Sequence, residues 1–271
     1  MAYVGCALAI YLGSLPVLTY VLENAYSKPK QDRMMVRHYQ RLKFDEYVSF
    51  EHFKTYALKG FDGRTSPIFL VAVTVHNAGL ALFSLYLLVG ASLVAFQMLG
   101  AEGVQSLCDP SMWDQYSVEY WAKLFYWSKY YEFLDTWIII AKSDRLGKRG
   151  RPTVLQVYHH CGVVVCVWAT MVTRAPWAIY PVVLNCGVHT FMYFYFLANS
   201  LGCGKQMAKF VTSVQLGQFV VGIAVGVSTT TFCPQDPNLR LSCVVYLLYV
   251  VGLLVLFLDL FRNKYKSKQK I

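Results

Sequence analysis

Long apolar segments alternate with short polar ones along nearly the whole chain, and the apolar segments recur seven times. Each is long enough to cross a hydrocarbon layer of about 30 Å as a helix. The predicted spans cover residues 3–22, 67–98, 118–141, 153–172, 177–199, 207–231 and 241–261. The one sizeable polar region, 23–66, has the spacing of an amphipathic helix lying at the cytosolic membrane surface. The pattern therefore predicts an all-α polytopic membrane protein, with seven transmembrane helices in a single domain, 1–271.

Polar side chains interrupt four consecutive spans, each time on one face of the expected helix. In the span 118–141, Lys129, Glu132, Asp135 and Thr136 occupy offsets 0, 3, 6 and 7. Each charge at mid-membrane costs roughly 2.5 to 3.5 kcal/mol, so this face must meet protein or a wet cavity. The next three spans add Gln156, His159 and His160, then His189 with Tyr193, then Thr212, Gln215 and Gln218. Four polar faces on four successive spans predict one shared site.

Composition and the placement of charge narrow the class further. With 56% hydrophobic and only 15% charged residues among 271, the chain is too apolar for an ordinary soluble domain. Of its 25 Lys and Arg residues, 21 lie in 23–66, 142–152, 200–209 and the tail after 261, whereas the remaining loops hold only Arg174 and Arg240. This asymmetry predicts a lumenal N-terminus and a cytosolic C-terminus. It also accounts for the net charge of +10 without a nucleic-acid partner, because the cations border one leaflet.

The depth of the polar groups suggests the shape of a substrate. At about 1.5 Å per residue, Asp135, His159, His189 and Gln215 lie roughly 9 to 15 Å from the cytosolic ends of their spans. Toward the lumen the chain offers mainly apolar residues, such as the run 219–227. A polar chamber that opens to the cytosol and leads into an apolar dead end suits a soluble head group with a long hydrocarbon tail.

Each of these features also has a purely structural interpretation. Lys129 and Glu132 would form a buried ion pair that holds helices in register, and His159 with His160 would hydrogen-bond across helices. The glycines of the span 207–231 fit close helix packing. We favour a functional interpretation because several polar groups coincide in depth on neighbouring spans.

Adjacent histidines also suggest a metal site like that of a membrane di-iron enzyme. Only three of the six histidines approach one another in the predicted fold, and Gln156 stands where a third clustered histidine would be. An amide is a poor ligand for a borderline metal. Three imidazoles and a carboxylate could still hold one ion, but we expect neither a metal nor a bound cofactor.

Four sequence motifs resemble those of a known enzyme family. They are K-x-x-E-x-x-D-T at 129–136, Q-x-x-H-H at 156–160, H-x-x-M-Y-x-Y-F at 189–196 and T-x-x-Q-x-x-Q at 212–218. In this order and span placement they resemble the very-long-chain fatty acid elongases, which are condensing enzymes of the endoplasmic reticulum membrane. The resemblance covers 129–218 and, more loosely through the seven-span topology, the whole chain. It implies that spans 2 to 7 form a bundle or barrel around an acyl tunnel.

The implied reaction condenses a long-chain acyl-CoA with malonyl-CoA to give 3-ketoacyl-CoA, CO2 and free CoA. The implied partners are the lipid bilayer, these two CoA substrates, and the ketoacyl reductase, dehydratase and enoyl reductase of an elongation cycle; the resemblance also allows a homodimer. Two positions depart from the usual motifs. Gln156 replaces a His common in animal members, which inclines the expected substrate toward polyunsaturated chains, and Phe196 lacks the hydroxyl of the usual Tyr.

Expected roles follow when this chemistry is combined with the polar faces. A neutral imidazole in a low-dielectric site can attack a thioester, and His159 is the expected nucleophile. His160 and His189 would position substrate or move the proton, with Glu132 or Asp135 orienting an imidazole. Of the remaining expected substrate contacts, Lys129 would bind anionic groups, and Gln156 and Tyr193 would line the chamber. The enolate would be stabilised by Asn185, Gln215 or Gln218. The CoA phosphates would be bound by Arg145, Lys148 and Arg149.

Two alternatives stay open at this point. Cys161 is a rival nucleophile, since soluble condensing enzymes use cysteine, although a step of one residue turns it about 100 degrees from His160. The alternative class is a non-enzymatic seven-span receptor or small-solute transporter that uses the buried charges as a binding site or proton relay.

Two cysteines fall in loops that the topology places in the lumen. An oxidising compartment would allow Cys108 and Cys233 to pair, and the resemblance implies that the same two loops are joined. We expect a disulfide that staples these loops across the helix bundle.

Overall fold

The computed structural model describes residues 2–25, 67–145, 152–201, 207–233 and 236–263, and every regular element in these ranges is a helix. The longer helices are α1 (Ala2–Ala25), α4 (Pro67–Glu102), α8 (Val154–Val172), α9 (Ile179–Ser200), α10 (Ala208–Phe232) and α11 (Pro237–Phe261). The shorter elements are η2 (Gly103–Leu107), α5 (Met112–Gln115), α6 (Val118–Tyr131), α7 (Phe133–Arg145) and η3 (Pro176–Ala178), where η marks a 3-10 helix. The predicted all-α class is confirmed, while most of the expected interfacial segment, 23–66, lies outside the described residues.

Six of the described helices are long and apolar enough to cross a membrane, which fits a multi-pass membrane protein. They correspond to six of the seven predicted spans. The remaining one, 118–141, is divided into α6 and α7, which contain 14 and 13 residues. Neither is long enough to cross a bilayer alone, so the prediction of one continuous helix there is wrong and the count of seven spans stays a prediction.

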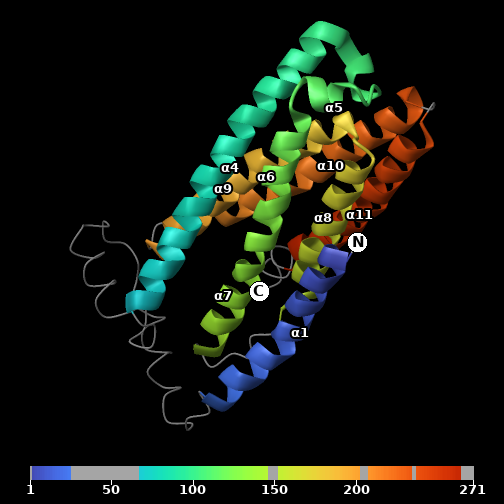
Figure 1. Ribbon diagram of the computed structural model, residues 1–271. Helices are drawn as coiled ribbons and strands as arrows, with labels where there is room; N and C mark the ends of the chain where they lie inside the picture. Colours follow the sequence, from blue (N-terminus) through green and yellow to red (C-terminus); the bar gives the residue numbers. More distant parts are fainter. Residues whose placement is uncertain (1, 26–66, 146–151, 202–206, 234–235, 264–271) are drawn as a thin grey trace.

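The division between α6 and α7 falls at Glu132, inside the expected polar face. Its N–H group bonds to the carbonyl of Ser128 at 2.9 Å, as in an α-helix, but the next bond runs from Asp135 N to Glu132 O at 3.0 Å. That spacing of three residues is tighter than α-helical, so the helical phase shifts after Glu132. In Figure 1, α7 continues α6 along the bundle. The phase shift lets polar residues before and after Glu132 face different helices.

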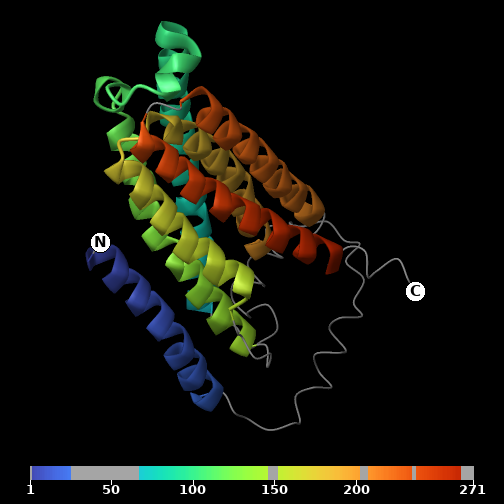
Figure 2. The same cartoon turned by 90° about the vertical axis from the view of Figure 1, so that its right-hand side faces the viewer.

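Six helices contact one another in a closed ring. Their order around it is α4, α9, α10, α11, α8 and α6, with α6 returning to α4. Helix α1 lies outside this ring against α7 and α8, as Figures 1 and 2 show. The main apolar cluster includes buried residues of α1 as well as of α4, α6, α8 and α9. Burial of apolar surface therefore holds α1 to the ring.

Two helix starts are set by local sequence. At α8, Thr153 Oγ1 accepts the N–H of Gln156 at 3.2 Å while Gln156 Oε1 accepts the N–H of Thr153 at 3.0 Å, which is a capping box. At α11, the Asp236 carboxylate accepts the N–H groups of Asn238 and Leu239 at 2.7 and 3.3 Å. The first cap fixes where α8 begins and thereby the position of the histidines that follow.

Two glycines bring α10 close to α11. An ideal Cβ on Gly222 would lie 2.5 Å from the hydroxyl of Tyr246, and one on Gly226 would lie 2.6 Å from a methyl group of Leu247. Close packing is therefore confirmed at both positions. At Gly217 no atom of the described residues lies within 4 Å of such a Cβ, so the packing interpretation is wrong for that residue.

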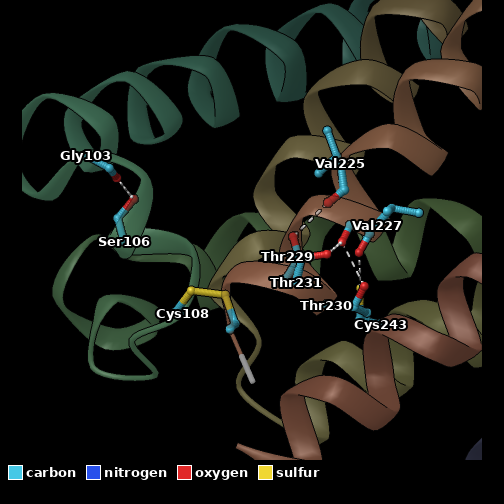
Figure 3. The surroundings of a disulfide bond; sticks show 11 residues. Gly103, Ser106, Cys108, Val225, Val227, Thr229, Thr230, Thr231 and Cys243 are labelled. Atoms are coloured by element: carbon cyan, nitrogen blue, oxygen red, sulfur yellow. Dashed lines mark hydrogen bonds between the residues drawn. A yellow bond between two sulfur atoms is a disulfide. The ribbon is translucent and has the colours of Figure 1, made fainter. Parts of the chain in front are cut away.

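The end of the bundle that carries α5, called the α5 end below, is held by covalent and polar contacts. Cys108, which follows η2, forms a disulfide with Cys233, which follows α10, across a sequence separation of 125 (Figure 3). Threonine hydroxyls near the end of α10 donate to carbonyls of their own helix. Arg174 contacts Asp114 at 3.0 Å on the same end. Connections that are distant in sequence are thus tied together here.

Candidate active site

A cavity of about 80 Å³ lies inside the helix ring. Its walls come from α6, α8, α9, α10, α11 and η3. The imidazole of His159 and the amides of Asn185 and Gln218 stand on these walls. Thr170, Trp177, Tyr246 and Tyr249 add three hydroxyls and an indole N–H, and the other lining residues are mainly apolar. On α8 alone the lining runs from His159 to Thr170, about 16 Å of helix. Toward the α5 end the cavity meets Trp177 of η3.

Lys129 and Glu132 form a buried ion pair beside this cavity. Lys129 Nζ donates to Glu132 Oε1 at 2.6 Å and to Asn185 Oδ1 at 3.0 Å, and it lies 3.5 Å from His189 Nδ1. Its fourth close neighbour is the ring of Phe125, whose centroid is 4.3 Å away. The ammonium group is thus committed to protein acceptors, and a contact with a substrate anion would have to replace one of them.

The rings of His159 and His160 have different surroundings although the residues are adjacent. Nδ1 of each ring is buried and has no hydrogen-bond partner within the described residues. Only His159 lines the cavity, whereas the ring of His160 packs 6.0 Å from those of Tyr11 and Phe133. An unpaired buried nitrogen is costly, so Nδ1 of His159 is a group that a ligand in the cavity could satisfy.

His189 is oriented by a carboxylate. Its Nδ1 lies 3.3 Å from Glu132 Oε1, and its ring centroid is 6.1 Å from that of His159. Because a carboxylate can only accept, this contact assigns a proton to Nδ1 and leaves Nε2 with a lone pair. Of the two carboxylates expected to orient an imidazole of the site, Glu132 contacts His189.

Asp135 makes contacts on two other helices. Its Oδ1 lies 2.7 Å from Nε2 of His76 on α4, and its Oδ2 accepts the hydroxyl of Tyr193 on α9 at 2.6 Å. Thr136 turns to a third helix, where its hydroxyl pairs with that of Tyr11 on α1 at 2.9 Å. Lys129, Glu132 and Asp135 thus all contact residues of α9, while Asp135 also reaches α4 and Thr136 turns to α1. One shared site for the polar residues of 129–136 stays a prediction.

The glutamines divide between the cavity and the surrounding structure. Gln218 lines the cavity and its buried Oε1 has no partner within the described residues. Gln215 donates to Met192 Sδ at 3.4 Å instead, and Thr212 bonds to the carbonyl of Ala208 at 3.0 Å. Gln156 is half-buried and caps α8, which corrects its assignment to the buried polar face.

The expected CoA-binding cations cannot be placed. Lys148 and Arg149 lie outside the described residues, as does the side chain of Arg145 at the end of α7. Within the described part of the chain, no three His, Cys, Asp or Glu side chains form a cluster that could hold a metal ion. The expectation of no bound cofactor stays a prediction.

Two side chains that contact the motif residues did not stand out in the sequence. His76 is buried in α4 and Tyr11 is buried in α1. A lone histidine within a span was a signal for the first. No pattern pointed to the second, because α1 contains three tyrosines and nothing in the sequence distinguishes Tyr11 from Tyr3 and Tyr20.

Comparison with known proteins identifies the family. The model of the ELO (GNS1/SUR4) family matches residues 34–271. The chain belongs to the ELO family. Fatty acid elongase sre1 of Dictyostelium discoideum is 30% identical over 156 residues, 55% of each chain. Fatty acid elongase 2 of Trypanosoma cruzi is 28% identical over 235 residues, 79% of this chain and 80% of the relative.

The chain is also similar to a mammalian elongase. Very long chain fatty acid elongase 6 of Mus musculus is 27% identical over 205 residues, 70% of this chain and 73% of the relative. The chain spans just over half the length of two Dictyostelium discoideum relatives, 56% and 55%. Membership of the ELO family and these elongase relatives support a role in fatty acid elongation.

Proposed function

We propose that this ELO-family chain is a condensing enzyme that extends a long-chain acyl-CoA by two carbons from malonyl-CoA. The observation that carries the proposal is the ring of His159. Its Nδ1 is buried and unpaired, and the ring stands on the wall of a mainly apolar cavity. A reactive imidazole beside a space for hydrocarbon matches the two parts of an acyl thioester.

The first half-reaction would form an acyl-imidazole. One ring nitrogen of His159 attacks the thioester carbonyl, the carbon–sulfur bond breaks, and CoA leaves as a thiol with the proton that the ring releases. Nε2 of His189, which holds a lone pair while Glu132 engages Nδ1, would carry this proton. The acyl tail would occupy the apolar walls that run from His159 toward Trp177.

In the second half-reaction malonyl-CoA would lose CO2 and leave an enolate. The enolate carbon attacks the acyl-imidazole, a carbon–carbon bond forms, the bond from the acyl carbon to the ring nitrogen breaks, and the departing imidazole takes up a proton from water. Asn185 and Gln218, both on the cavity wall, offer amide groups that can stabilise the enolate oxygen. The remaining keto group would require a reductase, a dehydratase and an enoyl reductase to complete a cycle.

The membrane setting is part of this proposal. We infer that α6 and α7 cross the membrane together as one interrupted span, that the C-terminus is cytosolic, and that the α5 end with its disulfide is lumenal in the endoplasmic reticulum. The separation of Lys and Arg residues supports this orientation. Arg145, Lys148 and Arg149 would then bind the CoA phosphates. The Q-x-x-H-H form of the histidine motif, which begins with Gln156, supports a preference for polyunsaturated acyl chains.

The decisive experiment uses the purified full chain in detergent and malonyl-CoA labelled in its free carboxyl group. We expect release of labelled CO2 that depends on added acyl-CoA, together with a 3-ketoacyl-CoA two carbons longer. Equal-length saturated and polyunsaturated acyl-CoAs, compared in the same assay, test the substrate preference. Saturable binding of acyl-CoA by folded protein without CO2 release would instead favour the receptor or transporter class.

A further inference from the structure

Asp135 is held by two rings from different helices, and neither partner lines the cavity. His76 Nε2 and the Tyr193 hydroxyl bind its two carboxylate oxygens at 2.7 and 2.6 Å. His76 and Tyr193 are both buried, so Asp135 joins α4 to α9 from within α7. None of the three residues of this Asp135 cluster is on the cavity wall, and neither is His189.

The hydrogen bonds of this cluster have one consistent direction. The carboxylate of Asp135 accepts from Tyr193 and, at its other oxygen, from Nε2–H of His76. Nδ1 of His76 is then free to accept from the hydroxyl of Tyr131, which lies 3.4 Å away. The ring of His76 also stacks 5.4 Å from that of Tyr131. The tautomer and the orientation of His76 are thus specified from both sides.

The burial of a carboxylate places the same demand on His76. Asp135 lies within a segment that we treat as membrane-spanning, where an ionised carboxylate needs a partner. Among the described residues, His76 is the one basic side chain within 4 Å of Asp135, and its neutral tautomer meets the carboxylate with an N–H donor. Lys129, the buried cation of the motif, is engaged by Glu132. The site therefore contains two acid–base pairs, and His76 completes the second.

The Asp135 cluster contacts His189 through Tyr193. The ring of Tyr193, 0% exposed, meets that of His189 edge-on at 5.6 Å between centroids. With its hydroxyl tethered to Asp135, this ring cannot rotate away from His189. If His76 is lost, Asp135 keeps one anchor and the tether of Tyr193 loosens.

We propose that His76 is a positioning residue of the condensing site, which holds Asp135 and through it the Tyr193 ring that fixes His189. This inference rests on the proposed condensing function. His76 touches neither substrate nor the reacting atoms in this arrangement. Its loss should lower kcat by about 10- to 100-fold, the range for a misplaced catalytic group, while KM for malonyl-CoA changes by less than about threefold.

The test compares His76→Gln, His76→Asn and His76→Leu in the full chain, purified in detergent. The amide nitrogen of Gln reaches the position of Nε2 and that of Asn the position of Nδ1, so we expect Gln to retain kcat within about threefold and Asn and Leu to lose it. Tyr86→Phe serves as the matched control, because it removes an exposed hydrogen bond on the same helix, 3.3 Å to Tyr120.

The Gln and Asn pair keeps the test decisive even if His76→Leu does not fold. Equal kcat for Gln and Asn, or a change in KM for malonyl-CoA with kcat retained, would overturn the positioning role. Failure of the proposed function looks different, since the unsubstituted chain would then show no condensation at all. A purely structural role would lower thermal stability in proportion to activity in every variant, whereas a positioning role lowers kcat beyond any loss of thermal stability.

Discussion

His159 and Cys161 lie two positions apart on α8, but their side chains have separate environments. The imidazole of His159 stands on the cavity wall, whereas the half-buried thiol of Cys161 packs against the main apolar cluster. A thiol in that environment has no base or cation to activate it through contacts within the described residues. The geometry therefore favours the imidazole over the neighbouring cysteine as the nucleophile of a condensation.

We expect His159→Ala to reduce acyl-CoA-dependent CO2 release by at least about 10³-fold, because the covalent intermediate cannot form. Cys161→Ala is the matched control and should stay within about twofold of the unsubstituted chain. Thermal denaturation in detergent would verify that both variants fold. The opposite pattern, an active His159→Ala and an inactive Cys161→Ala, would replace the imidazole mechanism with a cysteine one.

The pair of Lys129 and Glu132 is 2% and 3% exposed, so removal of one partner leaves a charge without compensation. Lys129→Met should destabilise the folded state by about 3 to 5 kcal/mol, the range for breaking a buried pair. The double variant Lys129→Met with Glu132→Gln should recover much of this loss, since no buried charge remains. Its turnover should stay low, because His189 has lost the carboxylate that orients it.

Unfolding in detergent and CO2 release measure these two effects separately. A double variant no more stable than Lys129→Met would show that the hydrogen bond to Asn185, rather than charge compensation, dominates the role of the pair.

Among the helices, α10 and α11 contact each other beside the cavity, and both contribute residues to its wall. Tyr246 of α11 lines the cavity, and its ring is tilted against that of Trp177 at the α5 end, with 5.4 Å between the centroids. Its hydroxyl occupies the space above Gly222 that a Cβ would fill, whereas Gly226 accommodates Leu247, which does not line the cavity. The two glycines therefore differ in what a side chain at each would displace.

Gly222→Ala should push the Tyr246 ring toward the cavity and shorten the longest product by about one two-carbon cycle, since a packed interior does not absorb the added volume. Gly226→Ala is the matched control, expected to lower stability without changing product length. Gas chromatography of the product acyl chains gives the distribution for each. An active, stable Gly222→Ala variant with unchanged products would indicate that the acyl tail leaves the ring between helices.

At the scale of the whole molecule, the disulfide between Cys108 and Cys233 cross-links two distant parts of the chain. It joins positions 125 residues apart at the α5 end. In the chain-entropy model a loop of this size contributes as much as about 4 to 5 kcal/mol, and a membrane-bound unfolded state should give less. The bond also secures the connections that surround the end of the cavity near Trp177.

Cys108→Ser should therefore lower the unfolding midpoint, and dithiothreitol should lower it for the unsubstituted chain but not for the variant. Cys6→Ser, at an exposed free cysteine of α1, is the matched control. Peptide mapping without reductant tests the bond directly. Free thiols at both Cys108 and Cys233 in oxidised, active protein would contradict the disulfide and weaken the lumenal assignment of the α5 end.

Much of this architecture was accessible from the sequence, because membrane solvation imposes strong local rules. An apolar run of about 20 residues must become a helix, since the bilayer offers no partner for backbone polar groups. The same rule made buried charges conspicuous, which is why Lys129, Glu132 and Asp135 were identified together with the histidines of α8 and α9. These inferences depend only on the polarity of each segment and on the bilayer that surrounds it. They therefore need no knowledge of neighbouring helices.

Tertiary structure decided which helix each polar group meets. The sequence pattern placed 129–136 on one continuous face, but the bond from Asp135 N to Glu132 O changes the helical phase there. Contacts with His76 of α4 and Tyr11 of α1 then give Asp135 and Thr136 partners that the ion pair does not meet, although Asp135 shares α9 with it. Periodicity describes a single helix, whereas the partners of a side chain depend on how six helices close into a ring, and that closure is a property of packing between segments distant in sequence.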